Sequence, residues 1–192
     1  GRSSAALDDQ ESVPMSLTVS GSASLSIQPK NVGNNGATSS LTFSLPASGE
    51  TLSLSSQYVE VAFNTNFDNW NIKTYTSSGR TTDGNFWGAL IGPDTAYKMY
   101  LRWKVADALG TPALSSGNWN SWTLYKDPAD PDWDYNSTYL NIANGGAWEG
   151  GWSQLADGSA CSSPIHLYVA GSTTGLVPGT YQNQMYLDFI HL

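Results

Sequence analysis

Residues 17–27 read LTVSGSASLSI, in which apolar or small residues alternate with serine and threonine. Successive side chains of a β-strand point to opposite faces, so this repeat of two predicts a long strand with one dry face. A glycine at its centre, Gly21, indicates a shallow point in the packing or a bulge. The candidate packing positions of the strand are Leu17, Val19, Ala23, Leu25 and Ile27.

Further runs of β-branched and aromatic residues follow, separated by clusters of Gly, Asn, Pro and Ser. Residues 105–109 are too short for a convincing helix and are closed by Gly110 and Pro112. A chain of 192 residues is within the range of one β-sandwich. We therefore expect an all-β protein, a single antiparallel β-sandwich of the immunoglobulin or jelly-roll kind, with long loops and negligible helix. The other predicted strands are 41–45, 58–63, 70–75, 86–91, 97–105, 119–125, 139–142, 165–170 and 181–190.

The composition favours an exported protein. Charged residues make up only 12% of the chain, and polarity comes instead from Ser, Thr, Asn and Gly, which suit the wet face of a strand. A net charge of -8 offers no basic patch for a phosphate backbone, so nucleic acid is not expected as a partner. No run approaches the roughly 20 apolar residues of a spanning helix, so no membrane span is expected. We expect an extracellular or cell-surface protein whose signal peptide has been removed.

Groups that carry catalysis are sparse. The chain has two histidines, His166 and His191, and neither lies in a recognised catalytic motif. Cys161 is the only cysteine, so an intrachain disulfide is excluded and a buried, inert thiol is the expectation. No Gly-rich phosphate loop and no paired zinc ligands are present. The sequence therefore predicts a protein that is not an enzyme.

An acidic, proline-containing stretch is the candidate metal site. Its carboxylates repel one another without a cation, and their oxygens are ligands that calcium prefers. The glycine turn and distal glutamate of an EF-hand loop are absent, and a solvated loop whose aspartates bond to local backbone amides is the alternative. Calcium is the one cofactor that this pattern suggests, through Asp127, Asp130, Asp132 and Asp134.

Eight tryptophans and ten tyrosines suggest a second kind of binding, because sugar rings stack on exposed aromatic faces. Aromatic residues also fill sandwich cores and subunit interfaces, so contact with protein is an equal alternative. A calcium-dependent carbohydrate-binding module or lectin-like adhesin, with glycans as partners, is therefore an alternative function. The candidate stacking residues are Trp133, Trp148 and Trp152.

Residues 178–190 read PGTYQNQMYLDFI, a turn followed by an alternating strand. This ending resembles the closing strand of secreted bacterial pilin-type β-sandwiches, including spore-coat-like and chaperone-usher subunits, in which a Gly-Thr-Tyr turn precedes the final strand. The paired cysteines of many such pilins are absent here. The resemblance implies an immunoglobulin-like sandwich that polymerises.

In such families an N-terminal strand leaves its own subunit and completes the sheet of the next one. Backbone hydrogen bonds supply the pairing, and alternate side chains fill a groove in the acceptor. The resemblance implies a polar leader at 1–14, a donor strand at 15–28 and a sandwich domain at 29–192. We expect a structural subunit of an extracellular filament or pilus, a head-to-tail homopolymer, whose donor residues are Leu17, Val19, Ala23, Leu25 and Ile27. The alternative is that the same segment is the first strand of a self-contained domain.

Overall fold

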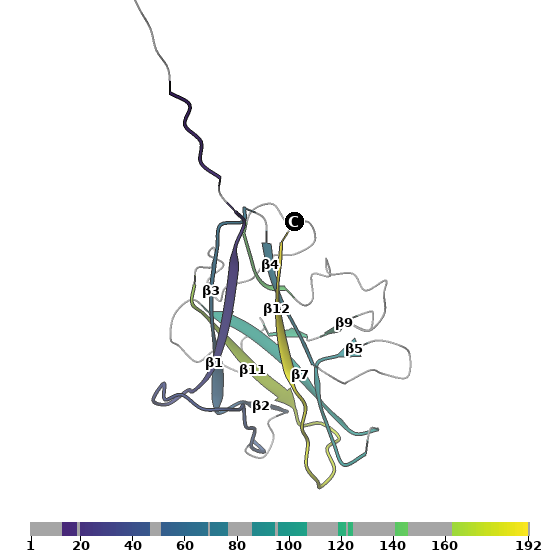
Figure 1. Ribbon diagram of the computed structural model, residues 1–192. Helices are drawn as coiled ribbons and strands as arrows, with labels where there is room; N and C mark the ends of the chain where they lie inside the picture. Colours follow the sequence, from purple (N-terminus) through teal and green to yellow (C-terminus); the bar gives the residue numbers. More distant parts are fainter. Residues whose placement is uncertain are drawn as a thin grey trace, which may run out of the picture.

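The computed structural model shows a β-protein built from short and long strands (Figure 1). No helix occurs within the part of the chain that the structure describes, and every strand pairing there is antiparallel. The all-β class predicted from the sequence is therefore confirmed. The structure describes residues 13–18, 20–46, 51–68, 70–76, 86–94, 96–106, 119–121, 123–124, 141–145 and 163–191.

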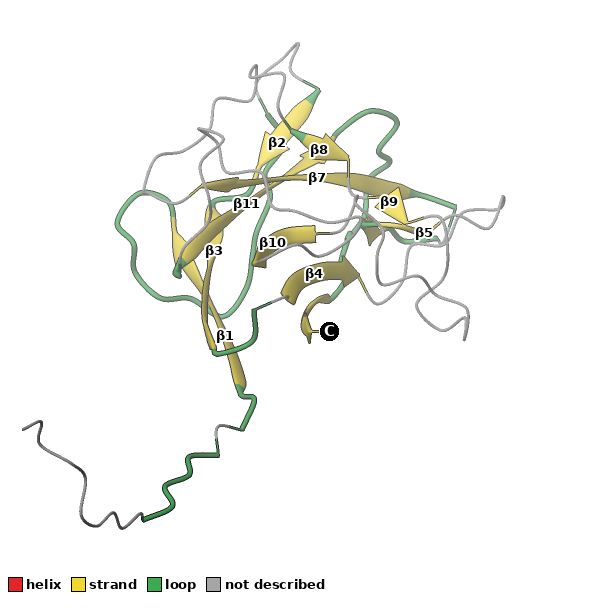
Figure 2. Cartoon of the chain, turned by 90° about the horizontal axis from the view of Figure 1, so that it is seen from above, coloured by secondary structure: helices red, strands yellow, loops and turns green. Residues whose placement is uncertain are grey.

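The larger sheet has seven strands and curls around the core (Figure 2). Its main path follows the order β1-β3-β11-β7-β6, with β2 added to β11 and β8 added to β7. The strands are β1 (Ala23–Asn31), β2 (Leu52–Leu54), β3 (Gln57–Thr65), β6 (Ala89–Ile91), β7 (Lys98–Ala106), β8 (Asn120–Ser121) and β11 (Ile165–Ser172).

Two smaller sheets complete the described strands. One has three strands in the order β10-β4-β12, and in it β12 pairs with β4 along all seven of its residues, from Met185 opposite Thr76 to His191 opposite Trp70. The other joins β5 to β9. Their strands are β4 (Trp70–Thr76), β5 (Phe86–Trp87), β9 (Thr123–Leu124), β10 (Asn141–Gly145) and β12 (Met185–His191).

The main core lies against one face of the large sheet. Strand alternation places every second residue of β3, β7 and β11 on this face, and β4 adds Trp70 and Ile72 from the three-stranded sheet. Trp70 packs between Phe63 of β3 and Phe189 of β12, with ring centroids 4.9 and 5.4 Å apart respectively. The buried members of the core are Val59, Val61, Trp70, Ile72, Leu101, Trp103, Val105, Ile165, Leu167 and Val169.

A second, smaller cluster lies on the opposite face of the large sheet. It contains Tyr58, Tyr168, Trp119 and Ala170, and the rings of Tyr58 and Tyr168 stack with centroids 5.5 Å apart. Because β11 is packed on both faces, its first seven residues are all buried. This strand is thus the centre of the described fold.

The observed strands differ from the predicted ones in several places. The predicted strand 86–91 is divided between β5 and β6, the predicted strand 119–125 contains β8 and β9, and β2 was not predicted. The first strand begins at Ala23 rather than at residue 17, and it continues to Asn31. Residues 41–45 form no strand, because side chains meet their backbone: the amide of Thr42 donates to Gln57 Oε1 and its carbonyl accepts from Ser55 Oγ. The last strand begins at Met185, since the backbone of Gln182 pairs with Ile91 in a separate bridge.

Among the described residues there is no helix with the length and apolar character needed to cross a bilayer. This agrees with the expectation of no membrane-spanning helix.

Candidate functional site

A groove runs between the outer edges of the two main sheets, along β1 and β12. Within the described residues, β1 pairs with β3 on one side, and only its lower end is bridged on the other, from Lys30 to Ala37. Strand β12 is paired with β4, and no other described strand pairs with it. Figure 1 shows β1 in purple and β12 in yellow on the same side of the molecule. The two open edges therefore border one channel.

Two hollows lie along this channel, and a third adjoins them below the channel. The upper one, of about 730 Å³, lies between Leu25 of β1 and Leu187 and Phe189 of β12. The middle one, of about 380 Å³, lies between Ile27 and Met185 and reaches the core. The adjoining hollow, of about 860 Å³, is mainly apolar and is lined chiefly by residues of the segments 40–45 and 173–183 rather than by β1 or β12. It shares Leu41, Phe43, Leu90 and Asn183 with the middle one.

The channel leaves apolar side chains at the margin of the core partly exposed. Met185, Leu187 and Phe189 pack against the core but are only partly buried, and 46% of Ile27 is exposed. Partly buried apolar residues along two open strand edges are what an added strand would cover. The lining is thus suited to an extended peptide with alternate apolar side chains.

Residues 13–18 form a segment of that kind, and it leaves the domain at its upper end (Figure 1). Its large apolar side chains stand at every second position and are almost fully exposed, at 82% for Val13, 94% for Met15 and 87% for Leu17. Pro14, Ser16 and Thr18 occupy the alternate positions. The side chains of Val13 and Met15 extend the apolar alternation upstream of Leu17, the residue at which the predicted strand begins.

Residues 20–22, just before β1, are bound to residues at the end of β3 through contacts that no sequence pattern indicates. The side-chain amide of Asn66 accepts from the Ser22 N–H at 2.7 Å and donates to the Ser20 carbonyl at 2.8 Å. Gly21 lies so close to the ring of Phe67 that a Cβ atom at residue 21 would overlap the ring. Asn66 and Phe67 belong to a turn, where Asn is common for local reasons, so their role was not predictable.

The predicted donor residues fall into two groups. Ala23, Leu25 and Ile27 lie in β1 and are paired with Thr65, Phe63 and Val61 of the same chain. Leu17 lies in the exposed segment and Val19 lies outside the described residues. Donation to a second copy concerns an assembly and stays a prediction, and so do the boundaries at residues 14 and 28.

The candidate metal and sugar residues all lie outside the described residues. They are Asp127, Asp130, Asp132, Asp134, Trp133, Trp148 and Trp152, and Cys161 lies outside as well. Within the described ranges, no three His, Cys, Asp or Glu side chains are placed to share a metal ion. Calcium and glycan binding therefore stay predictions.

A charged cluster lies on the face of the large sheet opposite the main core. Lys30 of β1 donates to Glu60 of β3 at 2.9 Å, and Nε2 of His166 on β11 lies 3.8 Å from the same carboxylate oxygen. The hydrogen bond to Glu60 raises the pKa of the Lys30 ammonium, and burial raises the pKa of the neighbouring Tyr58 hydroxyl. These contacts join three adjacent strands, which is a structural role.

Comparison with known proteins gives no relative for this chain. No family model matches it, and neither curated proteins nor solved structures provide a match. Its function is therefore inferred from the geometry of the groove and of the exposed segment.

Proposed function

We propose that this chain is a structural subunit of an extracellular filament, in which residues 13–19 of one copy lie in the groove between β1 and β12 of the next. One observation carries the proposal: the same chain has a channel lined in part by incompletely buried apolar residues and an exposed segment whose apolar side chains alternate. Binding of the segment in the channel would bury the exposed apolar side chains of both. Because donor and acceptor are different surfaces, the contact is head to tail and propagates.

The energetics favour burial of this segment. Covering one large apolar side chain contributes about 1.5–3 kcal/mol, so Val13, Met15 and Leu17 together contribute roughly 4–9 kcal/mol. Ordering the segment and joining two molecules oppose this term. Backbone hydrogen bonds to the edge of β12 add to the burial.

The shape of the subunit sets the direction of the added strand. The segment leaves at the end where β1 begins and β12 finishes (Figure 1). In a linear head-to-tail stack it therefore enters the next copy at the opposite end, near residues 173–184. It then runs antiparallel to β12 and parallel to β1, and its seven residues from 13 to 19 equal the length of β12.

We further propose that the seven-stranded and three-stranded sheets are the two layers of an immunoglobulin-like or jelly-roll-like sandwich, with the donated segment as an additional strand at their open side. Support comes from the core, in which Trp70 and Ile72 of β4 pack with residues of β3, β7 and β11. The sparse charge and abundant Ser and Thr support an extracellular location.

Substitutions in the exposed segment test the proposal. Met15→Ser with Leu17→Ser removes two apolar side chains, whereas Thr18→Ser changes a polar position of the same segment. Fibres are counted by electron microscopy, and assembly is followed by size-exclusion chromatography. We expect fibres from the unsubstituted chain and from Thr18→Ser, and monomers from the double variant. Equal polymerisation of all three, or a monomeric unsubstituted chain at every concentration, contradicts the proposal.

A further inference from the structure

We infer that the contacts around residues 20–22 prevent the N-terminal segment from folding back into the groove of its own chain, and so direct it to a second copy. This inference rests on the proposed function. It names the contacts that decide whether the groove receives the N-terminal segment of its own chain or that of another copy. The contacts are made by Thr65, Asn66 and Phe67, which together are called the exit clamp.

Folding back needs only a short turn at residues 20–22. Residues 20–22 read Ser-Gly-Ser, and a three-residue loop containing glycine is a common β-hairpin connection. Such a hairpin would pair residues 15–19 with residues 23–27, the open part of the β1 edge, placing Ser16 opposite Ser26 and Leu17 opposite Leu25. Directly opposed residues share a face, so Leu17 would then enter the same channel that Leu25 lines.

The exit clamp opposes that reversal, because it holds both ends of the would-be loop along the end of β3. The Asn66 side chain binds Ser20 and Ser22 together, at 2.8 and 2.7 Å. The carbonyl of Ser22 also accepts from Thr65 Oγ1 at 2.9 Å and from the Asn66 N–H at 3.3 Å. A tight turn at residues 20–22 would break the bidentate contact with Asn66.

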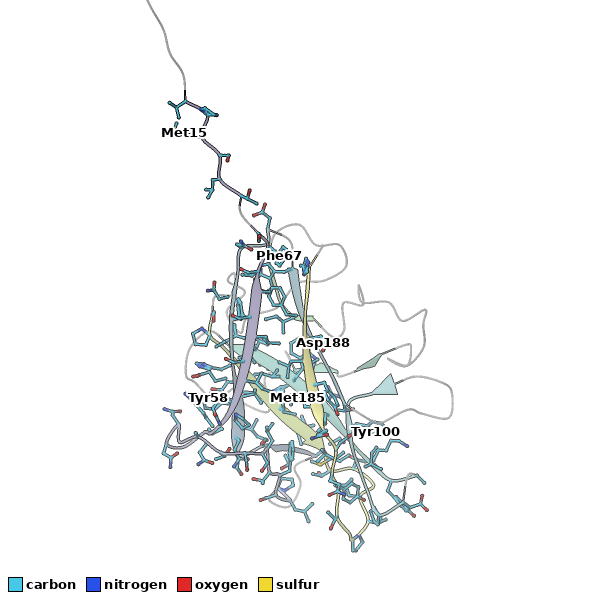
Figure 3. The ribbon with its side chains drawn as sticks, viewed as in Figure 1. Met15, Tyr58, Phe67, Tyr100, Met185 and Asp188 are labelled. Atoms are coloured by element: carbon cyan, nitrogen blue, oxygen red, sulfur yellow. The ribbon has the colours of Figure 1, made fainter. Side chains whose placement is uncertain are left out.

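Packing at Gly21 acts in the same direction. The ring of Phe67 lies against Gly21, and its position is fixed by stacking on His191, with centroids 3.7 Å apart. Figure 3 shows Met15 well beyond Phe67, on the segment that continues away from the domain. The clamp therefore points the apolar side chains outward, where a second copy can take them.

A chain with a broken clamp is expected to close on itself. Its own segment would cover its own groove, and the same molecule would lose both donor and acceptor. Closed monomers would then accumulate instead of fibres.

A cysteine pair detects the closed form. In a Cys161→Ser background, Ser16→Cys and Ser26→Cys place thiols at two exposed positions that meet in the hairpin at a separation within disulfide reach. The fraction of intramolecular disulfide in dilute protein is measured by mass spectrometry after mild oxidation. Fibre yield is measured separately, on chains without the cysteine pair.

Asn66→Ala is the main variant, and Phe67→Leu repeats the test with a different part of the clamp. The matched control is Asn34→Ala, which removes a side-chain bond to the Gly36 N–H of 2.8 Å in an exposed turn beyond the far end of β1. We expect the clamp variants to raise the intramolecular fraction at least threefold and to lower fibre yield by a similar factor, with the control unchanged. Circular dichroism confirms that each variant is folded.

The outcomes separate the two claims. If the unsubstituted chain forms fibres but both clamp variants leave closure and fibre yield unchanged, the inference is overturned and the proposed function stands. If the unsubstituted chain forms no fibres, the proposed function is overturned, and the inference falls with it.

Discussion

The ring of Phe67 lies nearly parallel to the imidazole of His191, with an interplanar angle of 14° and centroids 3.7 Å apart. This contact joins the turn after β3 to the last residue of β12 and borders the upper hollow of the groove. It connects the point at which the N-terminal segment leaves the domain with β12, the strand whose edge would receive a segment from another copy.

We expect this stacking to contribute about 0.5–1.5 kcal/mol to the free energy of unfolding, as aromatic pairs do beyond their buried area. A double-mutant cycle with Phe67→Ala, His191→Ala and the double variant measures it by urea unfolding of the monomer. The two single losses should sum to more than the loss in the double variant. Strict additivity would show that the rings do not interact in solution.

Substitutions of groove residues should weaken fibre assembly more than they destabilise the monomer. Ile72 is fully buried in the core, so Ile72→Ala should cost about 2–5 kcal/mol in the isolated chain. Met185 is only partly buried, so Met185→Ala should cost clearly less there, and yet raise the critical concentration for assembly severalfold. Urea unfolding and fibre sedimentation give the two quantities. A Met185→Ala chain that assembles at the original concentration would contradict the assigned groove.

A side chain added at Gly171 should destabilise the protein, because Met99 of the adjacent strand packs directly over this glycine. Gly171→Ala would force the Met99 side chain aside at a cost of about 1–3 kcal/mol. Gly33→Ala is the control, since no atom lies within 4 Å of a Cβ atom at that position. Thermal and urea unfolding should show a loss for the first and little change for the second. Adding Met99→Ala should make the loss at Gly171 smaller, and an unchanged loss would point to the backbone instead.

The residues of each strand that face the core could be predicted from the sequence, because they follow directly from the alternation of apolar and polar residues. Val59 and Val61 of β3, and Ile165, Leu167 and Val169 of β11, lie in the core as a period of two requires. Alternation does not report whether a partner strand exists. Residues 17–27 read as one strand, yet pairing begins at Ala23, because its partner strand β3 ends at Thr65.

The groove and the exit clamp were beyond sequence reasoning for a related reason. The lining joins Leu25 and Phe189, which are far apart in the chain, and only the fold brings them to one channel. Asn66 and Phe67 make contacts that depend on where a turn ends, which no local pattern specifies. Leu17, in contrast, could be predicted as a donor residue, because the alternation around it and the resemblance to pilin-type subunits are both visible in the sequence.

The last expectation concerns alkaline pH and the charged cluster of β1 and β3. The hydrogen bond to Glu60 raises the pKa of Lys30, and burial raises the pKa of Tyr58. A group whose pKa is higher in the folded state stabilises that state below its unfolded pKa, and the contribution disappears as the pH rises through the folded pKa. We therefore expect the contribution of both groups to the free energy of unfolding to be fully present near neutral pH and to decline above about pH 10.

Tyr58→Phe tests this directly, because it removes one of the two titrating groups while keeping the ring stacked on Tyr168. Glu60, His166, Lys30 and Tyr168 are the charged or titratable neighbours of Tyr58, and they remain. Melting temperatures between pH 8 and pH 11 should fall less steeply for Tyr58→Phe than for the unsubstituted chain. Tyr97→Phe, at an exposed tyrosine outside the cluster, should leave the slope unchanged. If the melting temperatures of both variants fall as steeply with pH as that of the unsubstituted chain, the Tyr58 hydroxyl contributes nothing to the loss of stability at alkaline pH. Its protonation would then not be coupled to folding.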